Sequence, residues 1–121
     1  MKTLAEFLAE ADAYAHGWLN HRGSFIRNRF GQTHKKTYER ITGEKPHPGD
    51  YDATVDHALR RGWARLDINH DAKKGEVYGL AQYDPEKWTP RHERALRRVK
   101  AALRAGGARD DVFRMSYGDE Q

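Results

Sequence analysis

The stretch HALRRGWARLDI, residues 57–68, changes its periodicity near its midpoint. Up to Arg61 it reads as the end of a helix, and from Trp63 onward apolar and polar residues alternate as in a half-buried strand. Gly62 stands at the change, where glycine commonly ends a helix. The stretch therefore predicts a helix that runs directly into a strand, with the large side chain of Trp63 packing that strand against the core.

Working outward toward the N-terminus, the sequence predicts two helices separated by a loop. Asp50 or Asp52 is placed to cap a helix that continues to Arg61. The loop GEKPHPGD, residues 43–50, has two prolines and two glycines. Before it, THKKTYERIT, residues 33–42, is predicted to be a short helix closed by Gly43.

Toward the C-terminus the same stretch opens a hairpin and then a long helix. WARLDIN, residues 63–69, and EVYGLAQY, residues 76–83, flank the polar turn HDAKKG. Thr89 is a suitable N-cap and Pro90 a suitable first residue for a helix that ends before Gly106. On a helical wheel its apolar residues form one narrow face: Ala95, Leu96, Val99, Ala102 and Leu103.

The N-terminal part is predicted to hold a helix and a second hairpin. Thr3 and Glu6 have the spacing of a capping box, and a helical apolar stripe continues from Leu4 to Ala15, with Gly17 ending the helix. The turn-forming NHRG, residues 20–23, is flanked by apolar pairs at 18–19 and 25–26, which predicts a short hairpin.

This order of elements predicts an α+β fold in a single domain over residues 1–121. We expect two antiparallel β-hairpins packed with about four helices that cover one face, and residues 108–121 forming either a loose tail or an edge strand. A winged helix is the alternative, because two helices precede the hairpin at 63–83 and Lys73 and Lys74 would stand at the wing tip. Against a winged helix, acidic residues lie near the start of the 52–61 helix, where a recognition helix would contact bases and phosphates.

The composition excludes several classes of protein. The chain has no cysteine, which excludes disulfides and thiol catalysis. Thirteen aromatic residues, three Trp, six Tyr and four Phe, supply enough bulk for a folded domain although 33% of residues are charged. No apolar run approaches the roughly 20 residues of a membrane span. Three acids in the first twelve residues are unlike a signal peptide. We expect a cytoplasmic protein that does not bind membranes.

Basic residues are the strongest functional signal. The formal net charge is +4, and the helix at 90–104 has six Lys or Arg against one Glu. A second basic stretch between residues 22 and 45 includes SFIRNRFG, residues 24–31, where arginines alternate with aromatic residues that stack on bases or pack inward. An ordinary solvated helix face would look similar. The residues predicted to contact DNA or RNA are Arg91, Arg94, Arg97, Arg98 and Arg104, helped by Arg27, Arg29, Lys35 and Lys36.

Enzyme signatures are missing from the sequence. The seven histidines include no pair at the i, i+4 spacing of zinc proteases and no HxH, and there is no phosphate-binding glycine loop or nucleophile elbow. We therefore expect a binding protein without catalytic residues, metal or cofactor. A metal-dependent hydrolase or nuclease remains an alternative if residues such as His57, His70 and Asp71 come together in space.

Four short stretches resemble small uncharacterised domains encoded by phages and other mobile elements. These are Trp18, GSFI at 23–26, ALRRGWARLDI at 58–68 and TPRHERALRRV at 89–99, so the resemblance covers residues 18–104 and is interrupted by the basic insert between Arg27 and Lys45. It implies a Trp-turn-Phe hairpin, a helix-Gly-Trp-strand unit and a Thr-Pro helix. Small proteins of this genomic setting commonly bind nucleic acid, or bind and inhibit a host defence complex, and the resemblance keeps both functions open.

Overall fold

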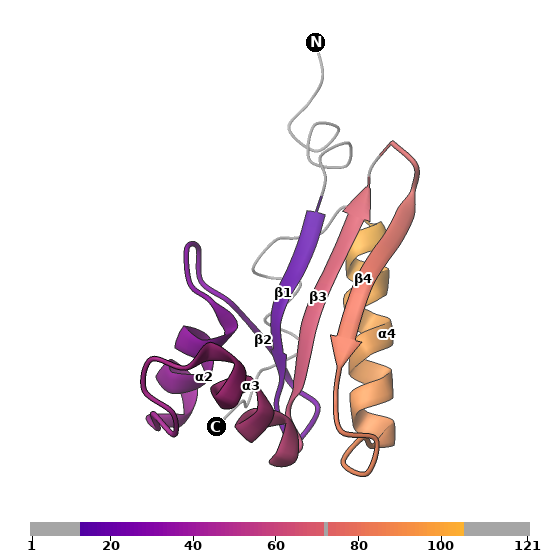
Figure 1. The fold of residues 1–121 in the computed structure, drawn as a ribbon. Coiled ribbons are helices and arrows are strands. Elements are labelled where there is room, and N and C mark those ends of the chain that lie inside the picture. The colour runs from indigo at the N-terminus through magenta and orange to yellow at the C-terminus, as the bar shows by residue number, and fades with distance from the viewer. Residues whose placement is uncertain (1–12, 72, 106–121) are drawn as a thin grey trace.

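The structure contains one four-stranded antiparallel sheet with helices on both of its faces (Figure 1). A computed structural model describes residues 13–71 and 73–105. In chain order the elements are β1 (Ala13–Leu19), β2 (Phe25–Arg27), α2 (His34–Thr42), α3 (Tyr51–Arg60), β3 (Ala64–Asp71), β4 (Glu76–Gln82) and α4 (Pro90–Arg104). The strand order is β2-β1-β3-β4, so both predicted hairpins are present and the pairing of β1 with β3 joins them. The α+β fold class is confirmed.

The first hairpin, β1–β2, is closed by a turn that Asn20 holds together. Leu19 pairs with Phe25 and Trp18 with Ile26, which is the predicted hairpin. The side-chain oxygen of Asn20 accepts hydrogen bonds from the backbone amides of Arg22 and Ser24, at 2.9 and 3.0 Å. Asn20 is fully buried, so the turn is anchored in the fold rather than free in solvent.

The prediction of a helix that reaches Ala15 is wrong at its C-terminal end. Residues 13–15 belong to strand β1, and Gly17 lies inside that strand instead of ending a helix. The apolar residues in this region fit the period of a helix and also that of a strand, and pairing with the neighbouring strands makes residues 13–15 a strand. A Cβ atom at Gly17 would collide with the backbone of Ile26, so glycine at this position lets β2 approach β1. Residues 4–12 of the predicted helix lie outside the described residues, as does the predicted tail or edge strand at 108–121.

The bounds of the two central helices lie within one residue of the predicted ones, and Asp50 and Gly43 act as predicted. The Thr33 side chain caps α2 by accepting from the amide of Lys36, and Gly43 ends it with φ 72°. The Asp50 side chain caps α3 by accepting from the amide of Ala53. These caps satisfy backbone groups that each helix end would otherwise leave open.

The second hairpin confirms the predicted alternation but not the winged helix. Along β3, residues alternate between buried and half-buried from Ala64 to Asp71. This hairpin does not project as a wing, because β3 also pairs with β1 over the whole of β1 and forms the centre of the sheet. The winged-helix alternative is therefore wrong.

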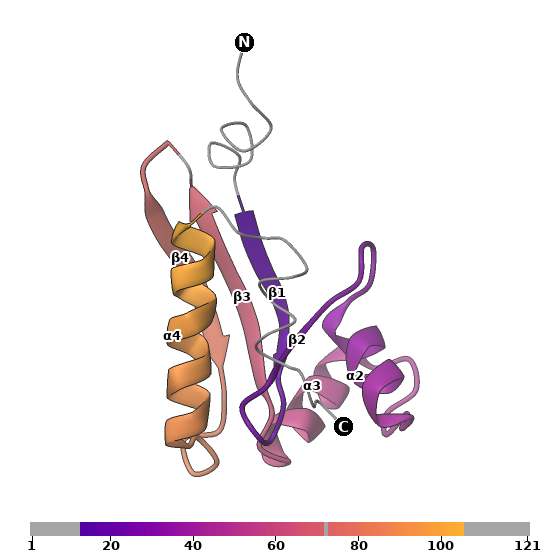
Figure 2. The same ribbon diagram turned by 180° about the vertical axis from the view of Figure 1, so that it is seen from behind.

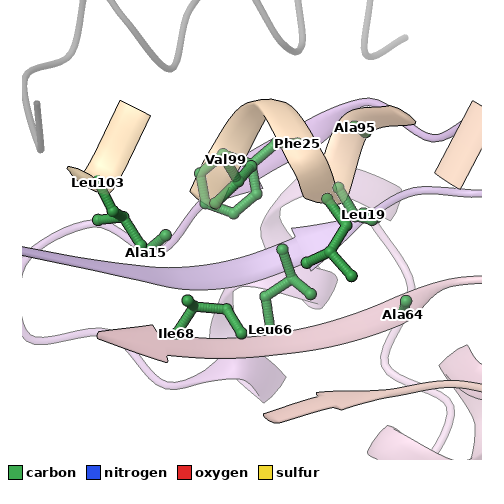
Figure 3. Packing of buried hydrophobic residues seen from close by; sticks show 10 residues of the cluster. Ala15, Leu19, Phe25, Ala64, Leu66, Ile68, Ala95, Val99 and Leu103 are labelled. Atoms are coloured by element: carbon green, nitrogen blue, oxygen red, sulfur yellow. The ribbon is translucent and has the colours of Figure 1, made fainter. Parts of the chain in front are cut away.

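The core is divided between the two faces of the sheet, which corrects the expectation that helices cover one face. Helix α4 packs on one face, where Val99 and Leu103 lie over Ala15, Leu19 and neighbouring side chains (Figure 3). Helices α2 and α3 lie on the opposite side and share a second cluster with the sheet (Figure 2). In that cluster the Trp63 ring lies 4.9 Å from Tyr38 and 6.0 Å from Trp18, between ring centroids. None of the helices within residues 13–71 and 73–105 is long and apolar enough to cross a membrane.

Candidate nucleic-acid interface

Helix α4 is fixed to the sheet by local capping and by its apolar face. The Thr89 side chain accepts from the backbone amide of His92, and the ring of His92 accepts in return from the amide of Thr89 at 3.2 Å. Ala95, Val99 and Leu103 are at most 3% exposed. The helix therefore cannot rotate to hide its polar side, and that side faces solvent.

The exposed side of α4 has five arginines. We define the arginine stripe as Arg91, Arg94, Arg97, Arg98 and Arg104, all of which are exposed. At 100° per residue these five positions fall within an arc of about 140°, along a helix about 22 Å long. Among the residues that the structure describes, no carboxylate forms an ion pair with any member of the stripe, although Glu93 lies beside it on the helix.

The N-terminal end of the arginine stripe borders a shallow hollow. The hollow has a volume of about 380 Å³ and is lined by Trp88, Thr89, Pro90, Glu93, Arg94 and Arg97. The Trp88 ring is stacked on His92, with centroids 5.2 Å apart, and packs against Tyr83 at 4.3 Å. An aromatic side chain thus lies next to two arginines of the stripe.

The second predicted basic group does not join the stripe. Lys35 and Lys36 lie on α2, in the layer on the other side of the sheet from α4 (Figures 1 and 2). Lys35 is occupied by an ion pair with Glu39 at 2.8 Å, which lowers the pKa of the Glu39 carboxyl. Arg27 instead lies over the Tyr14 ring, 5.5 Å from its centroid. The predicted basic residues therefore form two separate surfaces.

The aromatic residues of SFIRNRFG have different environments. Phe25 is fully buried in the cluster beneath α4, whereas Phe30 is 99% exposed. Arg29 and Phe30 line a hollow on the α2 side of the sheet together with residues of β1 and β3. Sequence reasoning missed this hollow, because its other residues come from distant parts of the chain and have no shared motif.

The histidines do not assemble the metal site that the sequence kept as an alternative, and the buried Nδ1 of His70 has no hydrogen-bond partner. His57 lies on α3, with its ring 6.0 Å from Tyr38 between centroids, whereas His70 lies on the same face of β3 as Leu66 and Ile68, which pack beneath α4. Within the described residues no group of three or more His, Cys, Asp or Glu side chains is placed to hold a metal ion.

His34 is the most constrained of these rings. Its Nε2 donates to the carbonyl oxygen of Leu66 at 3.0 Å, and its Nδ1 accepts from the Tyr51 hydroxyl at 3.3 Å. Arg65 donates to the same hydroxyl at 3.2 Å. Burial lowers the pKa of His34, despite Asp67 nearby, because the charged ring would lose its hydration. The neutral ring thus links α2 and α3 to β3.

Comparisons with known proteins give no relative for this chain. No protein-family model matches it, and neither a curated protein nor a solved structure shows significant similarity. The resemblance to domains of mobile elements stays a prediction, and the geometry of the chain itself has to carry any functional conclusion.

Proposed function

We propose that the protein is a nucleic-acid-binding protein that contacts the phosphate backbone through the arginine stripe on α4. The observation that carries the proposal is the absence of any ion-pair partner for these five arginines among the described residues, on a helix whose orientation is fixed. A guanidinium group presents paired N–H donors that match the oxygens of a phosphate. Five such groups on one side of a rigid helix are placed to follow a phosphate backbone.

The arrangement favours binding that depends little on sequence. Phosphate contacts position a protein on nucleic acid without reading its bases. We expect the five arginines to contact phosphates rather than bases, and the neighbouring hollow has only Trp88 as an aromatic surface. The affinity should therefore come chiefly from release of counterions, which makes it strongly dependent on salt.

The test is a titration of fluorescently labelled duplex DNA, single-stranded DNA and RNA at several salt concentrations. We expect a dissociation constant tighter than about 0.1 mM at low salt, with an affinity that falls steeply as salt rises. The double variant Arg94→Glu, Arg98→Glu should abolish this binding. Lys73→Glu with Lys74→Glu is the matched control, because it reverses the same number of charges in the exposed β3–β4 turn, outside helix α4.

Two outcomes would overturn the proposal. One is binding weaker than about 0.1 mM at low salt for all three nucleic acids. The other is equal loss of affinity in both double variants, which would show that only the net charge matters. Circular dichroism of the variants establishes that α4 is still folded, since both substituted arginines are exposed.

A further inference from the structure

A second hollow, on the opposite face of the sheet from α4, contains several features of a ligand site. We define the amide hollow as the space of about 310 Å³ lined by Tyr14, His16, Asn28, Arg29, Phe30, Gly31, Gln32 and Asn69. Tyr14 and His16 come from β1 and Asn69 from β3, and the remaining residues form the segment between β2 and α2 that stands beside β1 in Figure 1. Three distant parts of the chain therefore meet at this point.

A tight turn shapes the outer wall of the hollow. The amide of Gln32 donates to the carbonyl oxygen of Arg29 at 2.9 Å, and Gly31 has φ 79° within that turn. The left-handed backbone conformation at this position favours glycine. The turn places Phe30 at its tip, where the side chain is 99% exposed. The exposed Phe30 ring is therefore available to contact a bound molecule.

The floor of the hollow has polar groups with unused hydrogen-bonding capacity. His16 Nε2 lies 3.0 Å from Asn69 Oδ1, and this contact directs the Asn69 side chain and leaves its amide N–H groups available. The side-chain oxygens of Asn28 and Gln32 are buried and have no hydrogen-bond donor. Buried acceptors without a partner are rare in folded proteins, and a bound ligand is one way to satisfy them.

Aromatic and cationic groups flank these amides. The Tyr14 ring is 40% exposed, 5.0 Å from the His16 ring between centroids, with the Arg27 guanidinium over it. Arg29 is exposed at the rim. None of the eight residues that line the hollow is acidic.

We propose that the amide hollow binds a nucleobase together with its attached phosphate, supplied by a free nucleotide or by a single nucleic-acid strand. The rings of Tyr14 and Phe30 offer a stacking surface, and amide side chains pair with the edge of a base. Arg29, at the rim of the hollow, is positioned to contact the phosphate. A bare anion would not use the rings, and a purely apolar ligand would leave the amide oxygens unpaired. The site is separate from the arginine stripe and does not depend on it.

The test measures binding of AMP, GMP, CMP and UMP by calorimetry, with ribose 5-phosphate as the ligand that lacks a base. At least one nucleotide should bind, and ribose 5-phosphate should not. Phe30→Ala should weaken nucleotide binding at least about fivefold, because one stacked base is lost. Tyr83→Ala is the matched control, since Tyr83 is an exposed aromatic residue beside Trp88 and does not line the hollow. A short single-stranded oligonucleotide and its abasic counterpart show whether the strand is the source of the base.

Several results would overturn the site. The first is binding of ribose 5-phosphate as tight as that of the nucleotides, and the second is absence of nucleotide binding. The third is equal weakening of nucleotide binding by Phe30→Ala and Tyr83→Ala. Phe30 makes no buried contact, so its substitution should leave the fold intact. Asn69→Ala adds a second measurement, because it should change which base is preferred.

The two proposals fail separately. The variant Arg94→Glu, Arg98→Glu should bind nucleotides normally, whereas Phe30→Ala should keep the salt-dependent affinity for duplex DNA. If the protein binds nucleotides but has no affinity for duplex DNA, the proposal for the arginine stripe is overturned and the proposal for the amide hollow stands.

Discussion

The ring of His92 in α4 donates from Nε2 to the carbonyl oxygen of Asn20, 72 positions earlier, over 3.0 Å. The same Nε2 lies 3.1 Å from the carbonyl oxygen of Gly62. The ring is 1% exposed and its Nδ1 is 2.7 Å from the hydroxyl oxygen of Thr89. One side chain thus ties the start of the arginine stripe to the β1–β2 turn and to the junction between α3 and β3.

Replacing His92 by phenylalanine should destabilise the protein by about 1–3 kcal/mol, because the buried carbonyl oxygen of Gly62 loses its donor and that of Asn20 keeps only the amide of Gly23. Urea denaturation measures the change. His47→Phe is the control, since His47 is exposed and its ring lies 6.0 Å from that of His57 between centroids. Equal losses in the two variants would show that the His92 hydrogen bonds contribute nothing.

Substitution of Gly17 by alanine should cost more than about 2 kcal/mol, because the new Cβ would overlap the backbone of Ile26 and lie 2.9 Å from Cα of Arg27. The comparison is Gly75→Ala in the β3–β4 turn, which has φ 69° and no atom within 4 Å of the added Cβ. That change introduces only backbone strain, worth about 1 kcal/mol. Thermal unfolding that ranks the two variants in the reverse order would contradict this account of the β1–β2 pairing.

The stability of the protein should fall as the pH drops below about 6.5, in part because of His34. Its folded-state pKa is lowered by burial from an ordinary value of 6.5, so the unfolded chain binds a proton more readily than the folded one. The His34 contribution is complete above the unfolded pKa and is lost as the pH falls toward the folded pKa.

Free energies of unfolding measured between pH 5 and 8 should show a shallower dependence in His34→Gln. His21→Gln is a useful comparison, because burial and the charges of Arg22 and Arg61 lower the pKa of His21 in the same direction. An unchanged pH profile in His34→Gln would show that His34 is not the responsible group.

Arg97→Gln should reduce the salt dependence of duplex DNA binding by about 0.9 in the slope of log affinity against log salt, the value for one lost phosphate contact. Lys36→Gln, which removes the same charge, should leave the slope unchanged, because Lys36 lies on the other side of the sheet. Equal slopes in the two variants would mean that the phosphate backbone does not follow α4.

Local signals in the sequence predicted most of the elements. Helices α2, α3 and α4 have their caps and stop residues within a few positions, and short-range hydrogen bonds to those residues set their ends. The sequence predicts a helix where β1 begins, because the apolar residues from Leu4 to Ala15 form a helical stripe. The contacts that make residues 13–15 a strand come from β3, more than 50 positions away.

The two candidate sites differ in how far the sequence reveals them. The arginine stripe lies on one helix, so its spacing alone showed that five basic side chains would share a face. The amide hollow is assembled from positions 14–16, 28–32 and 69, and neither His16 nor Asn69 has a local pattern that marks it. Only sheet pairing, which sets Tyr14 opposite Asn69, brings them together.

The sequence by itself determined the identity of the helices, both hairpins and the basic face of α4, because each depends on interactions between residues close in the chain. The tertiary structure decided that β1 joins the hairpins into one sheet, that helices cover both of its faces and that the basic residues are divided between those faces. These outcomes depend on long-range packing, such as the contact of His92 with Asn20, which no local period specifies.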